Sequence, residues 1–159
     1  IFSVQREQTE IEGIEFVADY TLTTNDTLGL RYAFTEGEFD SNDDGQVDTD
    51  LDGANMAPNR LNLSWNRAWT ENLNTRLQLN AVLDRNFQNS TGQTVDEFDG
   101  YTTIDFSGEY TSSVGLFRIG VQNLTNTDYF TYFSQTVGND GRNFTGIGRS
   151  LTASYYIQF

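Results

Sequence analysis

Apolar and polar residues alternate along much of the chain with a period of two. The pattern is clearest near the C-terminus, where Leu151, Ala153, Tyr155, Ile157 and Phe159 share one parity and Thr152, Ser154 and Gln158 lie between them. A period of two is typical of a β-strand whose faces meet different surroundings. The alternation recurs in six earlier segments, so we expect seven strands of about ten residues each. They cover residues 13–20, 28–35, 61–66, 77–84, 103–110, 117–122 and 151–159.

The connections between these strands alternate in length. Short turns are predicted at Thr21–Thr27, Thr70–Asn74 and Thr111–Val114, and long polar links at Glu38–Asn59, Gln88–Gly100 and Thr125–Arg149. Short turns at one end and long loops at the other are typical of an antiparallel up-and-down transmembrane β-barrel. Alternation alone also fits a soluble β-sandwich, in which one face of each sheet is packed and the other is solvated.

Aromatic residues favour the barrel, because they are placed at the predicted strand ends. Tyr20, Trp69, Tyr110 and Phe159 lie at the short-turn end, and Phe34, Phe87 and Tyr101 at the long-loop end. Two such girdles mark the interfaces of a membrane barrel. The opposite parity then lines a polar lumen, with Arg31, Asn62, Asn66, Gln78, Asn80, Asp84, Asp105, Glu109, Arg118 and Gln122.

Composition removes most enzyme mechanisms. The 159 residues include no His and no Cys, which excludes imidazole bases, Cys–His nucleophiles, Cys/His zinc sites and disulfides. Asp105 and Glu109 share a face but stand about 13 Å apart along a strand, too far for a glycosidase pair. We therefore expect no catalysis. A net charge of −14, with only nine cations, also disfavours nucleic acid as a partner, because its phosphates would be repelled.

One link holds much of the negative charge. Residues 36–52 contain eight acids and no cation, and residues 40–48 read Asp-Ser-Asn-Asp-Asp-Gly-Gln-Val-Asp. In this order Asp40, Asn42, Asp44, Asp48 and the backbone carbonyl of Gln46 are candidate ligands for Ca²⁺, and Gly45 permits the sharp turn. Leu51 stands where an EF-hand has its bidentate Glu, so tight binding is not expected. The alternative is a solvated acidic loop.

Three segments resemble the TonB-dependent outer-membrane receptors. Residues 121–129 (VQNLTNTDY) resemble the family's v-x-N-L-x-[ND]-x-x-Y, and residues 146–152 (GIGRSLT) its G-x-G-R-[ST]-[LFY]-[TS]. Residues 11–16 (IEGIEF) are similar to i-x-G-[VI]-E-[LF]. A terminal Phe preceded by alternating apolar residues, here Leu151, Ala153, Tyr155, Ile157 and Phe159, resembles the signal read by the barrel-assembly machinery.

The resemblance implies a plugged barrel of about 22 strands in the bacterial outer membrane. Seven strands cannot close it, and the chain starts at Ile1, so residues 1–159 read as a C-terminal barrel segment without the plug domain. The expected function is uptake of a ferric siderophore or similar bulky nutrient, driven by the TonB complex through the missing N-terminal region. Membrane lipid surrounds such a barrel, and Tyr129, Tyr132, Phe133 and Arg142 are candidate ligand contacts. The alternative from another class is a soluble calcium-binding β-sandwich for adhesion or carbohydrate binding.

Overall fold

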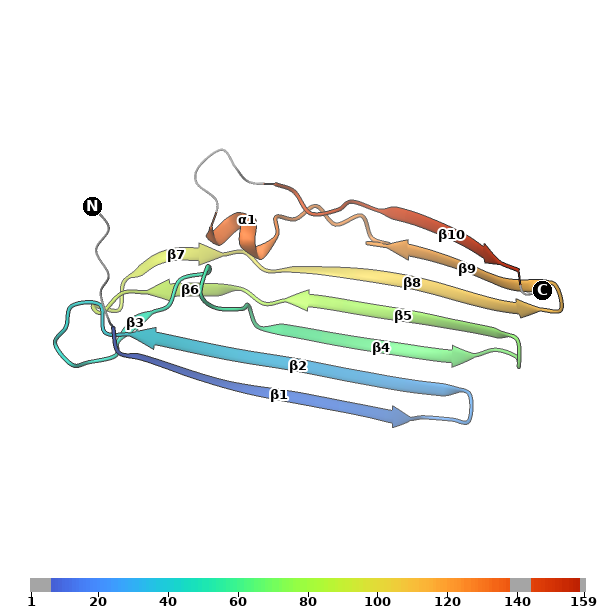
Figure 1. Ribbon diagram of the computed structural model, residues 1–159, viewed down its shortest axis with the longest axis horizontal. Coiled ribbons are helices and arrows are strands. Elements are labelled where there is room, and N and C mark those ends of the chain that lie inside the picture. Colours follow the sequence, from blue (N-terminus) through green and yellow to red (C-terminus); the bar gives the residue numbers. More distant parts are fainter. Residues whose placement is uncertain (1–6, 138–143, 158–159) are drawn as a thin grey trace.

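The computed structural model describes residues 7–137 and 144–157, and most of them form one long antiparallel sheet (Figure 1). Each of its seven long strands pairs with the next one along the chain, as the alternation predicts. The strands are β1 (Thr9–Thr21), β2 (Asp26–Phe39), β4 (Arg60–Ala68), β5 (Leu73–Val82), β8 (Tyr101–Ser112), β9 (Gly115–Gln122) and β10 (Ser150–Tyr156). Among the described residues β1 and β10 do not pair with each other, so the sheet is open.

The short turns lie at the predicted end of the sheet, and local hydrogen bonds close them. Between β4 and β5 the Thr70 hydroxyl accepts the backbone N–H groups of Asn72 and Leu73, at 3.2 and 3.1 Å. The turn between β8 and β9 ends at Gly115, whose φ of +147° disfavours any side chain. A Cβ there would also lie 2.3 Å from the carbonyl oxygen of Tyr156. This turn therefore requires glycine.

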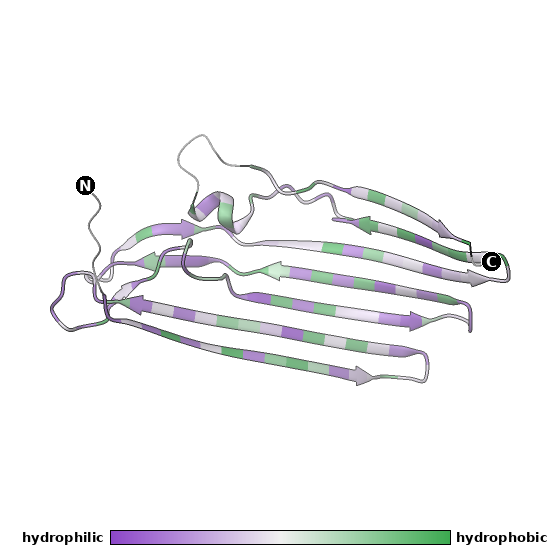
Figure 2. Ribbon diagram, viewed as in Figure 1, coloured by the Kyte–Doolittle hydropathy of each residue, from purple (hydrophilic) through white to green (hydrophobic). Residues whose placement is uncertain are grey.

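The two faces of the sheet differ in polarity, and alternating bands along each strand make this visible in Figure 2. The register places apolar residues opposite one another across neighbouring strands, as in Leu63 with Leu79 and Leu77 with Phe106. Many of these side chains are exposed, including Ile14, Tyr20 and Leu151, the last with 76% of its surface accessible. An uncovered apolar face of this size is what a sheet in lipid presents.

The long links contain more structure than the sequence pattern predicts. Short strands β3 (Thr49–Asp50), β6 (Arg85–Gln88) and β7 (Thr94–Phe98) extend the long-loop end, and α1 (Tyr132–Thr136) lies between β9 and β10. The β6–β7 hairpin forms a separate two-stranded sheet, so the predicted link at residues 88–100 contains a short strand that the pattern does not predict. These segments are too short for periodicity to reveal them. None of the helices in the described segments is long and apolar enough to cross a membrane.

The buried apolar residues gather at this long-loop end rather than within the main sheet. Phe87, Phe98 and Tyr132 form a small core, with Val82 and Tyr101 partly buried against it. The rings of Phe98 and Tyr132 meet edge to face with 4.8 Å between centroids. The prediction that Phe87 and Tyr101 belong to a lipid-facing girdle is therefore wrong. Phe87 lies past the end of β5, and Tyr101 has the parity of the polar face.

Candidate functional site

A continuous network of polar side chains runs across the polar face of the sheet. Asn80, at its centre, accepts hydrogen bonds from Asn62 and Gln78 and donates one to Asp105 at 2.9 Å. Arg76 continues the network by donating to Gln78 at 2.9 Å and to Asn66 at 3.3 Å. These groups come from β4, β5 and β8, whose register sets them side by side. The hydrogen bonds hold the polar side chains in place on a face that water can reach.

Ion pairs lie on the same face, on either side of this network. Arg118 donates to Glu109 at 2.6 Å between β9 and β8, and Arg31 lies 3.7 Å from Asp19 between β2 and β1. At the short-turn end a hollow of about 700 Å³ opens on this face, lined by Asn66, Arg76, Glu109 and Arg118 among others. The charged and amide side chains of this face can form hydrogen bonds and ion pairs with polar molecules.

The predicted lumen residues share this face, with one exception. Arg31, Asn62, Asn66, Gln78, Asn80, Asp105, Glu109, Arg118 and Gln122 lie on main strands at polar-face positions. Asp84 does not, because β5 ends at Val82 and the Asp84 carboxylate instead accepts the backbone N–H of Gly100 at 2.6 Å. Arg76 and Asp19 were absent from the predicted set, although their parity in the sequence places them there.

The loop that carries α1 folds over the long-loop end on the polar side of the sheet. Val82 and Tyr101, which support the small core, are register partners on the same face as the pair Asn80 and Thr103. The Gln135 side chain fastens the helix, since its amide oxygen accepts the Asp99 N–H at 3.1 Å and its amide nitrogen donates to the Asp99 carbonyl at 2.9 Å. The α1 loop therefore packs on the long-loop end of the polar face.

The two C-terminal motifs meet at the base of this loop. Asn123, buried and with a φ of +50°, donates through its amide to the carbonyls of Thr127 and Ile147 at 2.8 and 3.2 Å. Its backbone N–H donates to Asp105 at 2.8 Å, which ties the loop to the polar network. Gly146 donates to the Tyr129 carbonyl at 2.7 Å and packs so close to that ring that a Cβ would overlap it. The hydrogen bonds of the Asn123 amide and the close packing of Gly146 against Tyr129 therefore explain the asparagine and the glycine of the two motifs.

The candidate ligand contacts differ in how they are presented. Tyr129 stacks on Tyr101 with 4.1 Å between ring centroids, and Tyr132 is only 9% exposed. Burial raises the pKa of Tyr132, and its hydroxyl has no hydrogen-bond partner within the described residues. Phe133, in contrast, keeps 70% of its surface exposed. Arg142 lies outside the described residues. Phe144, at 75% exposed, is a further aromatic group of the same loop.

The acidic loop is organised by hydrogen bonds to its own backbone. Asp40 accepts the N–H groups of Asn42, Asp44 and Gly45, the last at 2.7 Å. Burial acts to raise the pKa of Asp40, but these donors outweigh it and hold that pKa below its usual value. Gln46 donates its N–H to Asp44 at 2.9 Å, and Asp48 accepts from the Thr49 hydroxyl.

The acids of this loop are spread apart rather than gathered around one point. Within residues 7–137 and 144–157 no group of three or more acids is placed to hold a metal ion. Glu38 lies in the part of β2 that continues past its pairing with β4. Burial and the charges of Asp50 and Glu36 raise the pKa of Glu38. Calcium binding therefore stays a prediction.

The C-terminal strand carries most of the predicted assembly signal on a single face. Leu151, Ala153 and Tyr155 pair with Val121, Ile119 and Phe117 of β9. Tyr155 stacks on Phe117 with 4.3 Å between ring centroids. Ile157 follows the strand and is exposed, while Phe159 lies outside the described residues. The alternation of this segment is thus present in the structure, and its role in assembly stays a prediction.

Comparison with protein families decides what this sheet is. The family model described as TonB dependent receptor-like, beta-barrel matches residues 2–124. The chain belongs to this TonB-dependent receptor family. Members of the family are outer-membrane transporters of Gram-negative bacteria and work with TonB, so the open sheet is a portion of a transmembrane barrel. No solved structure matches the chain. The family assignment sets aside the soluble sandwich.

Proposed function

We propose that this chain forms part of the wall and outer mouth of a receptor that imports a ferric siderophore or a similarly bulky nutrient. Residues 1–159 would be the C-terminal segment of the barrel, and a plug domain elsewhere in the receptor would engage the TonB complex. The observation that carries the proposal is the placement of the α1 loop on the polar side of the sheet, above the network centred on Asn80. A ligand entering the lumen would pass this loop.

The exposed aromatic rings of the loop support a bulky ligand with apolar parts. Phe133 and Phe144 are large, accessible and only eleven residues apart in the chain, while Ser134 joins their segments by accepting the Phe144 N–H at 2.6 Å. Ligand sites combine such apolar surfaces with a few fixed polar groups. Here the Gln135 and Asn123 contacts fix the loop that displays the rings.

Uptake by cells that express the intact receptor tests this function. Cells lacking the receptor gene are complemented with the wild type, and uptake of ⁵⁵Fe carried by a panel of siderophores is measured with and without TonB. We expect uptake of at least one ferric siderophore that needs both proteins. The Phe133→Ala variant should reduce it, whereas Val95→Ala, an exposed site on β7, should not. TonB-dependent uptake of a non-ferric nutrient alone would contradict the siderophore assignment.

A further inference from the structure

A positively charged side chain, that of Arg67, lies on the apolar face of the sheet, close to the short turns. Arg67 of β4 has the parity of Leu63 and Trp65, and its register partner on β2 is Asp26. The family places this face against lipid, and short turns lie at the periplasmic side of such barrels. Arg67 is therefore at the level of the inner leaflet of the outer membrane, where a charged group needs a partner.

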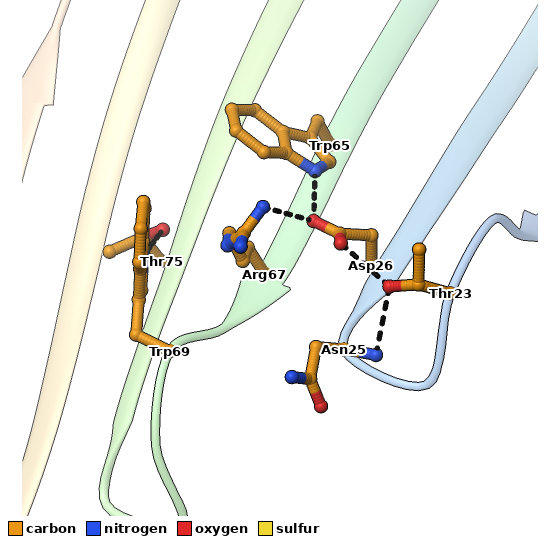
Figure 3. Close-up of polar contacts among 7 residues, drawn as sticks. All are labelled: Thr23, Asn25, Asp26, Trp65, Arg67, Trp69 and Thr75. Atoms are coloured by element: carbon orange, nitrogen blue, oxygen red, sulfur yellow. Dashed lines mark hydrogen bonds and ion pairs between the residues drawn. The ribbon is translucent and has the colours of Figure 1, made fainter.

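The structure holds this guanidinium in a fixed position (Figure 3). Both carboxylate oxygens of Asp26 accept hydrogen bonds, one from the Thr23 hydroxyl at 2.7 Å and one from the Trp65 indole N–H at 2.8 Å. Arg67 donates one N–H of its Nη1 to the same carboxylate at 3.2 Å. The Trp69 ring lies 4.4 Å from the guanidinium carbon, and that indole is itself fixed by a 2.8 Å bond to Thr75.

The guanidinium still has binding capacity. A guanidinium has five N–H groups, and Asp26 accepts a hydrogen bond from one of those of Arg67. No other hydrogen-bond partner of Arg67 is found among the described residues. Its Nε is buried, so the outer Nη groups provide the accessible donors of a side chain that is 36% exposed. A planar guanidinium whose Nη groups keep unused N–H donors matches the oxygens of a phosphate.

An apolar groove begins at the same place. It has a volume of about 520 Å³ and shares Trp65 with the Arg67 cluster. The groove continues away from the short turns over β2, β4 and β5. It is lined mainly by aliphatic and aromatic side chains, among them Tyr20, Leu28, Leu63, Leu77 and Leu79. A molecule that fills both parts must join an anionic or polar head to an apolar chain.

We propose that this surface is a binding site for one glycerophospholipid of the inner leaflet, with an acyl chain in the groove and the phosphodiester on Arg67. The charge of the head group complements Arg67, and the groove continues from it on the membrane-facing side. Asp26 acts as a positioning residue that aims the guanidinium. The indole rings of Trp65 and Trp69 flank the head group at the depth where tryptophan is favoured.

Native mass spectrometry of the intact receptor in mild detergent tests the site. Phosphatidylethanolamine and phosphatidylglycerol are titrated into wild type, Arg67→Gln, Asp26→Asn and Arg31→Gln. Arg67→Gln should weaken binding about tenfold, as loss of a charge-assisted contact does. Arg31→Gln, which changes a cation on the polar face, should bind as wild type does. Asp26→Asn should weaken binding less than Arg67→Gln does, because the cation remains and only its positioning is impaired.

Two outcomes of this titration would overturn the proposal. Equal binding by wild type and Arg67→Gln would show that lipid adheres to the apolar face without a phosphate contact. Equal losses in Arg67→Gln and Asp26→Asn would show that the cluster only supports local folding. A second measurement needs no variant: wild type should prefer phosphatidylglycerol over diacylglycerol of the same chains by about tenfold. Equal affinity for the two would also refute the site.

Discussion

The two ends of the sheet are stabilised by different means. At the long-loop end Phe87, Phe98 and Tyr132 form a small apolar core, and polar side chains such as Asp40 and Gln135 bond to backbone amides. At the short-turn end the turns are tight, and the exposed Trp69 ring lies over the guanidinium of Arg67, which forms an ion pair with Asp26. The main strands between the two ends contribute none of the buried hydrophobic residues found in the described segments.

This difference follows from the solvent at each place. Loops that stand in water must bury apolar groups against one another to be ordered, whereas strands in lipid can leave their apolar face uncovered. Near the membrane interface a side chain with an apolar body and a polar tip satisfies both surroundings. The position of the core is thus a consequence of where the membrane ends.

The largest expected effect comes from removing the centre of the outer core. Phe98→Ala deletes the most completely buried side chain of the described residues and should cost about 3–5 kcal/mol locally. Hydrogen exchange measured by mass spectrometry should accelerate in β6, β7 and α1, while β4 and β5 stay protected. Val95→Ala on the same hairpin is the matched control, because Val95 is exposed. Uniform loss of protection in the whole sheet would mean that the two regions are not independent.

A smaller effect is expected at the other end from Trp69→Ala. The change removes the ring next to Arg67 and the hydrogen bond to Thr75, together worth about 1–2 kcal/mol. The midpoint of heat-induced unfolding of the intact receptor, followed by electrophoretic mobility, should fall. Trp69→Phe keeps a ring face and should recover part of the loss. A fall as large as that of Phe98→Ala would contradict the contrast between the ends.

The sequence was sufficient to predict the seven long strands and their faces, because one apolar and one polar environment impose a strict period of two. Leu151, Ala153 and Tyr155 show why: each must face the same way for the strand to lie in its sheet. The short β3, β6 and β7 carry too few residues to show a period. Phe87 was misplaced for the same reason, since its parity could not be followed past Asp84.

The site was less predictable, because it depends on contacts between distant segments. Gln135 and Asp99 are 36 residues apart, and their mutual bonds leave no pattern in the sequence. The Arg67 cluster leaves one signal in the sequence, namely the alternation of Trp65, Arg67 and Trp69 on one face. Only the register with β2 brings Asp26 to it.

A still smaller, pH-dependent effect distinguishes two acids of the long-loop end. Because the pKa of Asp40 is lowered, its bonds to the loop backbone are intact above its ordinary pKa of 3.8 and are lost as the pH falls through the folded value. The pKa of Glu38 is raised in the folded protein. The pairing of β2 with β3 therefore gains stability as the pH falls from neutrality through the folded pKa of Glu38.

Acidification should therefore first tighten β3 on β2 and then, below about pH 4, loosen the Asp40 turn. The exchange of the Leu51 and Gly45 amides, corrected for the intrinsic rate at each pH, reports the two steps separately. Glu38→Gln should abolish the first step and Asp40→Ala the second. A single step in the wild type would contradict this assignment.

The smallest expected effect is that of calcium on the acidic loop. Asp40 already satisfies loop amides with both of its oxygens, so an ion would rely on Asn42, Asp44 and Asp48 and would bind weakly, at about millimolar concentration. Isothermal calorimetry of the intact receptor with calcium should show a weak binding heat that Asp44→Asn and Asp48→Asn together remove. The matched control Asp96→Asn, on β7, should leave that heat unchanged. Any divalent cation can relieve the repulsion between carboxylates by its charge alone. If magnesium gave the same heat as calcium, the effect would be screening of an acidic surface rather than a calcium site.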